Sequence, residues 1–334
     1  MHRSTQKRGS IWCAFRSSPL TTAARPKTMI EMRILGLLRP AQSRERRWHS
    51  PSSLRSIRLL RLLIFALLAT GLDASAEEVR IVRDLPYRLA NEPNDYAKSR
   101  CKLDLYLPAS GTEFPCVVWF HGGGLESGGK DSERQWGSSL AKAGIAMAAV
   151  DYRLSPKVQY PVYIQDAAAA VAWVHTHIAQ YGGEPRSVFV SGHSAGGYLA
   201  AMVAIDKRWL TAAGIDTDLL AGTLPVSGQM ITHSTVRKER GIPRSTEIVD
   251  EAAPLTHVRP GAPPMLLITG DHDLAERSDE NRRMHEALAK TGCDTSRFRE
   301  FKDRDHGSIK DRMLNQDDPA RIAFVAFIMQ HRMR

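Results

Sequence analysis

The sequence is poor in cysteine and has no long apolar run, and each scarcity excludes a class of protein. Four cysteines in 334 residues cannot build a disulfide-rich scaffold, and they show neither the CxxC nor the Cys/His spacing that binds zinc. Cys13 lies near the start, so Cys101, Cys116 and Cys293 allow at most one disulfide in the rest of the chain. The apolar run at residues 62–72 is 11 residues long, whereas a membrane-spanning helix needs about 20. We expect no metal ion and no stable membrane span.

Acidic residues are scarce only in the N-terminal part of the chain. The whole sequence has 46 Lys+Arg and 36 Asp+Glu, a formal net charge of +10, which by itself would favour a nucleic acid or an anionic surface as partner. Residues 1–76 contain 14 of the basic and 3 of the acidic residues, so residues 77–334 have 32 and 33 and are close to neutral. Because the positive charge is confined to one end, nucleic acid is excluded as a main partner.

Residues 54–76 show the three parts of a secretory signal peptide. A basic flank at Arg55, Arg58 and Arg61 precedes the apolar run, and Ala74-Ser75-Ala76 has the small-x-small pattern of a cleavage site. We expect residues 1–76 to be a basic leader and residues 77–334 to form one folded domain. If the segment is used, the protein is exported to the periplasm or the extracellular space; otherwise it is cytoplasmic. A disordered basic tail and an uncleaved anchor are the alternatives.

Short apolar runs alternate with helical stretches after residue 77, which predicts an α/β fold with a mainly parallel sheet covered by helices on both faces. The run 101–108 alternates Leu103, Leu105 and Leu107 and is typical of a half-buried strand, whereas most others are apolar throughout. We predict strands at 79–88, 101–108, 116–120, 144–152, 187–192, 221–228 and 264–270, a last strand before residue 306, and helices at about 131–143, 161–180, 195–205, 278–291 and 318–332.

Residues 231–260 do not fit this alternation. The segment is too polar for a core and long for a loop. Insertions of this kind in α/β sheets often cover a site. We therefore expect a small, partial lid here, with a solvated loop as the alternative.

A serine stands in a turn of small residues, Gly192-His193-Ser194-Ala195-Gly196, between a predicted strand and a predicted helix. In this setting a G-x-S-x-G pattern is typical of a serine exposed in a strained turn, where glycines avoid collisions. The helix that begins at Ala195 presents free N–H groups and its positive end to a developing oxyanion. The pattern suggests Ser194 as a nucleophile; an ordinary turn serine is the alternative.

A glycine loop, His121-Gly122-Gly123-Gly124, follows another predicted core strand. Backbone N–H groups of such a loop can approach a ligand closely, and the pattern resembles the oxyanion loop of lipases and esterases. Both turns lie at the carboxyl ends of parallel strands, where open α/β sheets bind ligands. We expect Gly123, Gly124 and Ala195 to form an oxyanion hole.

A serine hydroxyl needs a base and an acid that orients the base. Asp271 and Asp273 follow the strand at 264–270, and His306 follows the last predicted strand, in the chain order Ser, Asp, His found in α/β hydrolases. His272 and His285 are poorer candidates for the base, because one lies between the two aspartates and the other within a predicted helix. Asp271 or Asp273 can be the acid on this pattern; we favour Asp273.

The motifs HGGG and GHSAGG, with the stretches VDYRLSPKVQYPVYIQDAAAAVAWV, YGGEPRSVFVSGHSAGG and PPMLLITGDHD, resemble the α/β-hydrolase-fold esterases and lipases. The likeness covers about residues 100–310 and includes the groups related to hormone-sensitive lipase and to kynurenine formamidase. His193 replaces the usual Asp of the first group, which favours the formamidase-like or general carboxylesterase branch. The resemblance implies a Ser194, His306 and Asp273 triad, the oxyanion donors named above, and structural roles for Asp151, Tyr152, Arg153 and Asp166.

The predicted function is hydrolysis of small carboxylic esters, with short acyl chains preferred, by an acyl-enzyme mechanism that requires no metal and no cofactor. The preference for short chains rests on the small size of the expected lid. The same triad serves amides and formamides, so an arylformamidase or another amide or peptide hydrolase is an alternative, and a lipase or a polysaccharide deacylase also stays open. A binding protein without catalysis on the same fold is the rival from another class. The sequence does not indicate an oligomeric state.

Overall fold

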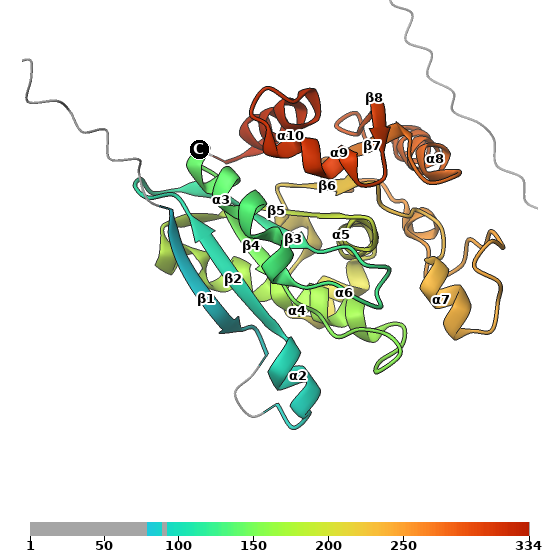
Figure 1. The fold of residues 1–334 in the computed structure, drawn as a ribbon, viewed down its shortest axis with the longest axis horizontal. Coiled ribbons are helices and arrows are strands. Elements are labelled where there is room, and N and C mark those ends of the chain that lie inside the picture. The colour runs from blue at the N-terminus through green and yellow to red at the C-terminus, as the bar shows by residue number, and fades with distance from the viewer. Residues whose placement is uncertain (1–78, 89–91, 334) are drawn as a thin grey trace, which may run out of the picture. The chain divides into compact units, whose positions relative to one another are not determined.

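The structure, a computed structural model, describes residues 79–88 and 92–333. An eight-stranded sheet in the order β1-β2-β4-β3-β5-β6-β7-β8 runs through this part of the chain (Figure 1). β2 pairs antiparallel with β1 and β4, and all other neighbours pair in parallel. The mainly parallel sheet predicted from the alternating pattern is confirmed. The predicted leader, residues 1–76, lies outside the described residues.

The strands are β1 Arg80–Pro86, β2 Lys102–Leu107, β3 Phe114–Phe120, β4 Ala146–Val150, β5 Gly183–His193, β6 Gly222–Val226, β7 Leu266–His272 and β8 Arg297–Asp305. The α-helices are α2 Asp95–Arg100, α3 Arg134–Lys142, α4 Val162–His177, α5 Ala195–Ile205, α6 Lys207–Ala212, α7 Ser234–Glu239, α8 Arg277–Lys290, α9 Ser308–Asp311 and α10 Pro319–His331. Short 3-10 turns lie at Lys130–Glu133, Ile178–Tyr181, Thr217–Leu219, Pro254–His257 and Arg312–Leu314.

Each predicted strand and each of the five predicted helices is present, and the boundaries shift by a few residues. The short helices α2, α6, α7 and α9 were not predicted. They have four to six residues each, which is too short for an apolar period to show. Their ends are fixed by local contacts instead; the Asp206 carboxylate, for example, accepts the Arg208 N–H and caps α6.

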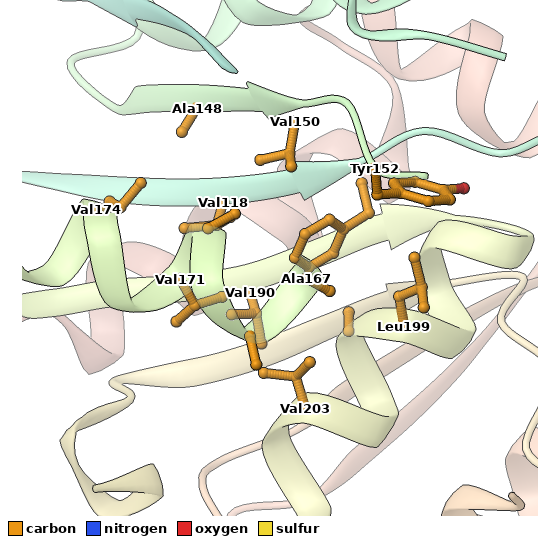
Figure 2. Packing of buried hydrophobic residues seen from close by; sticks show 14 of the residues in the cluster. Val118, Ala148, Val150, Tyr152, Ala167, Val171, Val174, Val190, Leu199 and Val203 are labelled. Carbon is orange, nitrogen blue, oxygen red and sulfur yellow. The ribbon is translucent and has the colours of Figure 1, made fainter. Parts of the chain in front are cut away.

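Helices cover both faces of the sheet, as predicted. On one face, the valines of β3 and β5 pack against α4 and α5, and Figure 2 shows Val118 and Val190 beside Val171 and Val203. On the other face, Trp119 of β3 meets α3 and α10. β3 is buried along its whole length, so the strand that leads to the glycine loop is held from both sides.

β2 corrects one expectation. Leu103, Leu105 and Leu107 share one face, as predicted, but the opposite face is not solvated, and the strand is buried from Leu103 onward. α3 covers that face so closely that a Cβ on Gly137 would lie 2.5 Å from the Tyr106 ring. The prediction of a half-buried strand was therefore wrong. The alternation of polar and apolar residues in β2 does not reveal that a helix covers its second face, which carries Asp104 and Tyr106.

The residues to which the resemblance assigned structural roles bind other parts of the protein. The Asp166 carboxylate is buried and accepts two hydrogen bonds from the Arg153 guanidinium, at 2.7 and 2.8 Å. The Tyr152 hydroxyl donates to the His121 carbonyl at 2.8 Å, and the Asp151 carboxylate accepts the Lys130 N–H at 2.8 Å. These contacts anchor the chain around the glycine loop.

The segment 231–260 is folded. It contains α7 and the turn Pro254–His257, and Val236 and Ala252 enter the same buried cluster as α4 and α5. The expectation that it is too polar for a core was wrong for these residues. A solvated loop is also excluded, because Tyr198 of α5 donates its hydroxyl to the Ala252 carbonyl at 2.8 Å.

Cys101, Cys116 and Cys293 are buried free thiols. Burial raises the pKa of Cys101 to about 11 and that of Cys116 to about 12, so both stay protonated at neutral pH. No helix within residues 79–88 and 92–333 has the length and apolar character needed to cross a bilayer.

Candidate active site

The predicted site residues lie at one edge of the sheet, where the parallel strands end. β3 leads into the glycine loop, β5 ends directly before Ser194, and β7 and β8 end directly before Asp273 and His306. The chain brings these residues together although Ser194 and His306, for example, are 112 positions apart. Carboxyl ends of neighbouring parallel strands meet at one edge, which is why the order of strands could locate the site.

Ser194 has a strained backbone conformation between β5 and α5. Its φ of 57° and ψ of −117° lie where side chains other than glycine are rarely found. The Ser194 N–H donates to the carbonyl of Val226, at the end of β6, at 2.9 Å. This bond and the start of α5 fix the turn, so the side chain projects from the sheet edge.

Two glycines make this turn possible. A Cβ on Gly196 would lie 1.9 Å from the Phe120 carbonyl oxygen, and a Cβ on Gly192 would lie 2.5 Å from the same atom. Both distances are far below van der Waals contact. The nucleophile turn predicted from small residues is therefore packed directly against the end of β3, and any other residue at position 196 would push the two apart.

Ser194, His306 and Asp273 form a continuous row of hydrogen bonds. His306 Nε2 lies 2.8 Å from Ser194 Oγ, and His306 Nδ1 lies 2.6 Å from Asp273 Oδ1. The Asp273 side chain is only 2% exposed, whereas the His306 side chain is 25% exposed. An imidazole in this position can take the serine proton while the carboxylate faces its other nitrogen.

Hydrogen bonds keep Asp273 ionised. Burial alone would raise the pKa of this carboxyl, but bonds from His306, from the Ser227 hydroxyl and from the Leu274 N–H outweigh it and lower the pKa to about 2. The charge that faces His306 is therefore present throughout the neutral range.

The alternative acid and bases lie elsewhere. Asp271 is exposed, and its carboxylate accepts the Arg304 N–H at 3.1 Å. His272 is exposed at the end of β7. His285 lies in α8, where its Nδ1 lies 2.5 Å from the Ser296 hydroxyl.

The glycine loop lies beside the serine. A Cβ on Gly122 would be 3.4 Å from Ser194 Cβ. Gly123 and Gly124 have φ values of +104° and +64°, which glycine adopts without strain, and a Cβ on Gly123 would lie 2.3 Å from the Ser127 carbonyl. Ala195 begins α5, so its N–H has no partner within the helix. Loop and helix start thus border the same side chain.

The segment 231–260 contacts this loop through α7. The Thr235 hydroxyl donates to the Gly124 carbonyl. Glu126 accepts hydrogen bonds from Lys238 at 2.7 Å and from Arg244 at 2.6 Å. The segment therefore contacts the glycine loop at Gly124 and, through Lys238 of α7 and Arg244 beyond it, the nearby Glu126.

Three histidines in this part of the protein are neutral rings: His121 and His233 are buried, and His193 is partly exposed. Burial lowers the pKa of His121, His193 and His233 to about 3 in each case. His193 Nε2 donates to the His306 carbonyl at 2.6 Å. His193, which stands where the group related to hormone-sensitive lipase usually has Asp, therefore fixes the backbone of the candidate base. Among the described residues, no cluster of His, Cys, Asp or Glu could hold a metal ion.

Ser227, whose hydroxyl donates to Asp273 Oδ2, is not among the site residues predicted from the sequence. A signal was present: Ser227 comes directly after the apolar run of β6 and so at the same sheet edge as the other candidates. No short motif marks it, and a serine before a glycine is also an ordinary turn pair.

Known proteins resemble this chain in sequence and in fold. The family profile described as BD-FAE matches residues 103–221. The carboxylesterase NlhH of Mycobacterium tuberculosis is 33% identical over 144 residues, which are 43% of this chain and 42% of that protein. The chain spans about half or less of the length of the curated relatives that it matches.

Two solved structures have the same fold. A truncated carbohydrate esterase from gut microbiota superposes with a TM-score of 0.63 at 17% identity, over 76% of this chain and 97% of that one. The Pyrobaculum calidifontis esterase superposes with a TM-score of 0.57 at 21% identity, over 85% and 93%. The α/β-hydrolase fold is therefore confirmed.

The buried histidines predict a loss of stability in mild acid. Above about pH 6.5 these histidines are neutral in both the folded and the unfolded protein. Below that pH the unfolded chain binds protons that the folded protein accepts only near pH 3. The free energy of unfolding therefore falls as the pH falls. His233→Asn keeps the cap on the Thr235 N–H and removes one titration. The slope of unfolding free energy against pH should then become shallower, by at most about 1.4 kcal/mol per pH unit.

Urea unfolding from pH 7 to about pH 4 measures this slope. Exposed His272→Asn is the matched control and should leave the slope unchanged. Parallel curves for wild type and His233→Asn would contradict the assignment of His233 as a neutral buried ring.

Proposed function

We propose that this α/β hydrolase, a relative of carboxylesterases and lipases, is a serine hydrolase of small carboxylic esters. The observation that carries the proposal is the row of contacts from Ser194 Oγ through His306 to Asp273, at 2.8 and 2.6 Å. A hydroxyl, an imidazole and an ionised carboxylate in this order are the parts that acyl transfer requires. The similarity to carboxylesterases in sequence supports esters as the substrate class.

In the first half of the reaction, His306 Nε2 accepts the proton of Ser194 as Oγ attacks the ester carbonyl carbon. Asp273 stabilises the imidazolium that forms, because its carboxylate stays charged with a pKa of about 2. His306 then gives the proton to the leaving alcohol, and the acyl group stays on Ser194 Oγ.

In the second half, His306 takes a proton from water, which attacks the acyl carbon and releases the acid. The tetrahedral oxyanion of each half is stabilised by the N–H groups of Gly123, Gly124 and Ala195. The contact of the preceding Gly122 with Ser194, the left-handed backbone of Gly123 and Gly124, and the position of Ala195 at the start of α5 support this role. Each such donor is worth about 10²–10³ in kcat.

Short acyl chains are the proposed substrates. The lid segment 231–260 is small, and its contacts with Gly124 of the glycine loop and with the nearby Glu126 hold it next to the oxyanion donors. A segment fixed by several contacts does not readily move aside for a long chain. Amides and formamides use the same triad and are the alternative outcome of the substrate test.

The acid of the triad gives the sharpest test. Asp273→Asn should lower kcat on p-nitrophenyl butyrate roughly 10³–10⁴-fold, because the amide has no negative charge to stabilise the imidazolium and no longer holds His306 in the tautomer with its proton on Nδ1. Asp271→Asn, the same change two residues earlier on an exposed side chain, should stay within about twofold of wild type. Ser194→Ala gives the background rate.

Acetyl, butyryl, octanoyl and palmitoyl esters in the same assay test the chain-length preference. The proposal expects turnover to fall with chain length. In the aspartate test, equal losses of kcat in Asp273→Asn and Asp271→Asn would contradict the triad. Turnover that rises with length would make the protein a lipase, and turnover of formamides alone would make it a formamidase.

Export of the catalytic part is a further proposal, supported by the pattern of residues 54–76. Expressed with its full sequence, the protein should be recovered outside the cytoplasm with a new N-terminus after Ala76. N-terminal sequencing checks this, and Ala76→Arg, which puts a large charged side chain at the cleavage position, should block processing. An intact N-terminus on cytoplasmic protein would contradict export.

A further inference from the structure

The turn that follows β6 touches two members of the proposed triad at once. The Val226 carbonyl accepts the N–H of Ser194 at 2.9 Å. The next residue, Ser227, donates its hydroxyl to Asp273 Oδ2. Two consecutive residues thus hold the nucleophile turn on one side and the carboxylate on the other, so this turn sets how the two lie relative to each other.

Ser227 has an unfavourable backbone conformation for a serine. Its φ is +50°, and its side chain is fully buried. Glycine would adopt this φ without strain, whereas residues with a Cβ are strained there. Strained residues persist where the surroundings hold them and are concentrated at functional sites. Here the surroundings include β7, since the Ser227 N–H donates to the Ile268 carbonyl at 2.7 Å.

Helix α8 holds the same turn through three buried side chains. Arg277 donates to the Ser227 carbonyl, and Asn281 donates to the Gly228 carbonyl at 2.8 Å. Glu280 accepts the Met230 N–H at 2.9 Å. All three are less than 10% exposed. Buried charged and amide groups on one helix therefore satisfy successive backbone groups of one turn, which fixes that turn more firmly than surface contacts would.

The nucleophile helix α5 blocks movement from the other side. A Cβ on Gly228 would lie 2.8 Å from the Gly197 carbonyl carbon, and a Cβ on Gly197 would lie 2.8 Å from Gly228 Cα. The turn is therefore packed between α5 and α8. Ser227 cannot move away from Asp273 without a shift of one of these helices.

The carboxylate of Asp273 divides its contacts between its two oxygens. Oδ1 faces His306 Nδ1 at 2.6 Å and accepts the Leu274 N–H at 2.7 Å. Oδ2 accepts the Ser227 hydroxyl, with the Gly270 N–H at the longer distance of 3.5 Å. Without the hydroxyl, a buried charged oxygen loses its short hydrogen bond, and rotation about the Cβ–Cγ bond is opposed less strongly.

We propose that Ser227 is a positioning residue for the triad: its hydroxyl holds Asp273 Oδ2, and so keeps Oδ1 directed at His306 Nδ1, while the side chains of α8 hold Ser227 in place. This inference rests on the proposed function, since it assigns Ser227 a role in that reaction. Ser227 acts through Asp273 and does not touch the substrate.

Two variants remove the hydroxyl with different backbone consequences. Ser227→Ala keeps the Cβ and the strained φ, whereas Ser227→Gly suits the φ of +50°. Both should lower kcat on p-nitrophenyl butyrate about tenfold while KM stays within about twofold, because the hydrogen bond to a charged group acts on the base and not on substrate binding. A shared loss in both variants separates the hydroxyl from any change in backbone strain.

Ser191→Ala is the matched control. Ser191 is also fully buried, and its hydroxyl donates to the Leu224 carbonyl at 2.6 Å, a hydrogen bond within the sheet away from Asp273. This variant loses one buried hydrogen bond of similar length and should keep kcat within about twofold of wild type. Thermal unfolding of all three variants shows that each is folded at the assay temperature.

Proton NMR supplies a readout that does not depend on turnover. The far-downfield signal of the His306 Nδ1 proton, which lies in the bond to Asp273, should shift or broaden in Ser227→Ala and Ser227→Gly and stay unchanged in Ser191→Ala. Full kcat and an unshifted signal in both Ser227 variants would overturn the inference. An equal loss of kcat in Ser191→Ala would overturn it as well.

The same series distinguishes failure of this inference from failure of the proposed function. If the wild-type protein hydrolyses no ester, the proposed function is wrong, and the NMR signal alone decides whether Ser227 positions Asp273. If the wild type turns over and the Ser227 variants match it, the positioning role is wrong while the triad stands.

Discussion

The close approach of β3, β5 and α5 around Ser194 is the constraint on which the site depends. A Cβ on Gly196 would lie 1.9 Å from the carbonyl of Phe120, the last residue of β3. Because α5 begins so near the sheet, the chain must reverse within one residue, and Ser194 takes a φ of 57°. The same geometry brings the glycine loop beside the serine. Close packing and backbone strain thus create the reactive position before any catalytic partner is considered.

The second requirement is control of charge at this edge. His121, His193 and His233 are neutral, with pKa values of about 3, while Asp273 is ionised with a pKa of about 2. The negative charge next to His306 therefore has no cationic histidine beside it at neutral pH. A carboxylate in this place stabilises the imidazolium that forms during acyl transfer. Fixed hydrogen bonds on both carboxylate oxygens keep that charge in position.

Most of the fold and the triad candidates could be predicted from the sequence, because strands and tight turns produce local patterns of apolar and small residues. The apolar runs gave the strands, and the rule that ligands bind at the carboxyl ends of parallel strands placed Ser194, Asp273 and His306 at one edge. What could not be predicted depends on contacts between distant segments. α7 is too short to show a period, and its buried Val236 looks like any residue in a polar segment. The burial of β2 depends on the close approach of α3 at Gly137, and that residue is far from β2 in the sequence.

Ser227 illustrates the same limit within the site itself. Its partner Asp273 lies 46 positions away, and α8, which holds its carbonyl, lies further still along the chain. A sequence pattern can mark a nucleophile turn, because steric demands require particular neighbours. It cannot mark a hydroxyl whose role comes only from the oxygen that it faces.

The most direct measurement of the central claim is capture of the acyl-enzyme. The protein would be mixed with p-nitrophenyl butyrate, quenched in acid before steady state, digested and examined by mass spectrometry. The account predicts one butyryl group on the peptide that contains Ser194, absent from Ser194→Ala and from enzyme quenched after the ester is exhausted. Turnover of the ester with no acyl group on Ser194, or with the group on another residue, would contradict it.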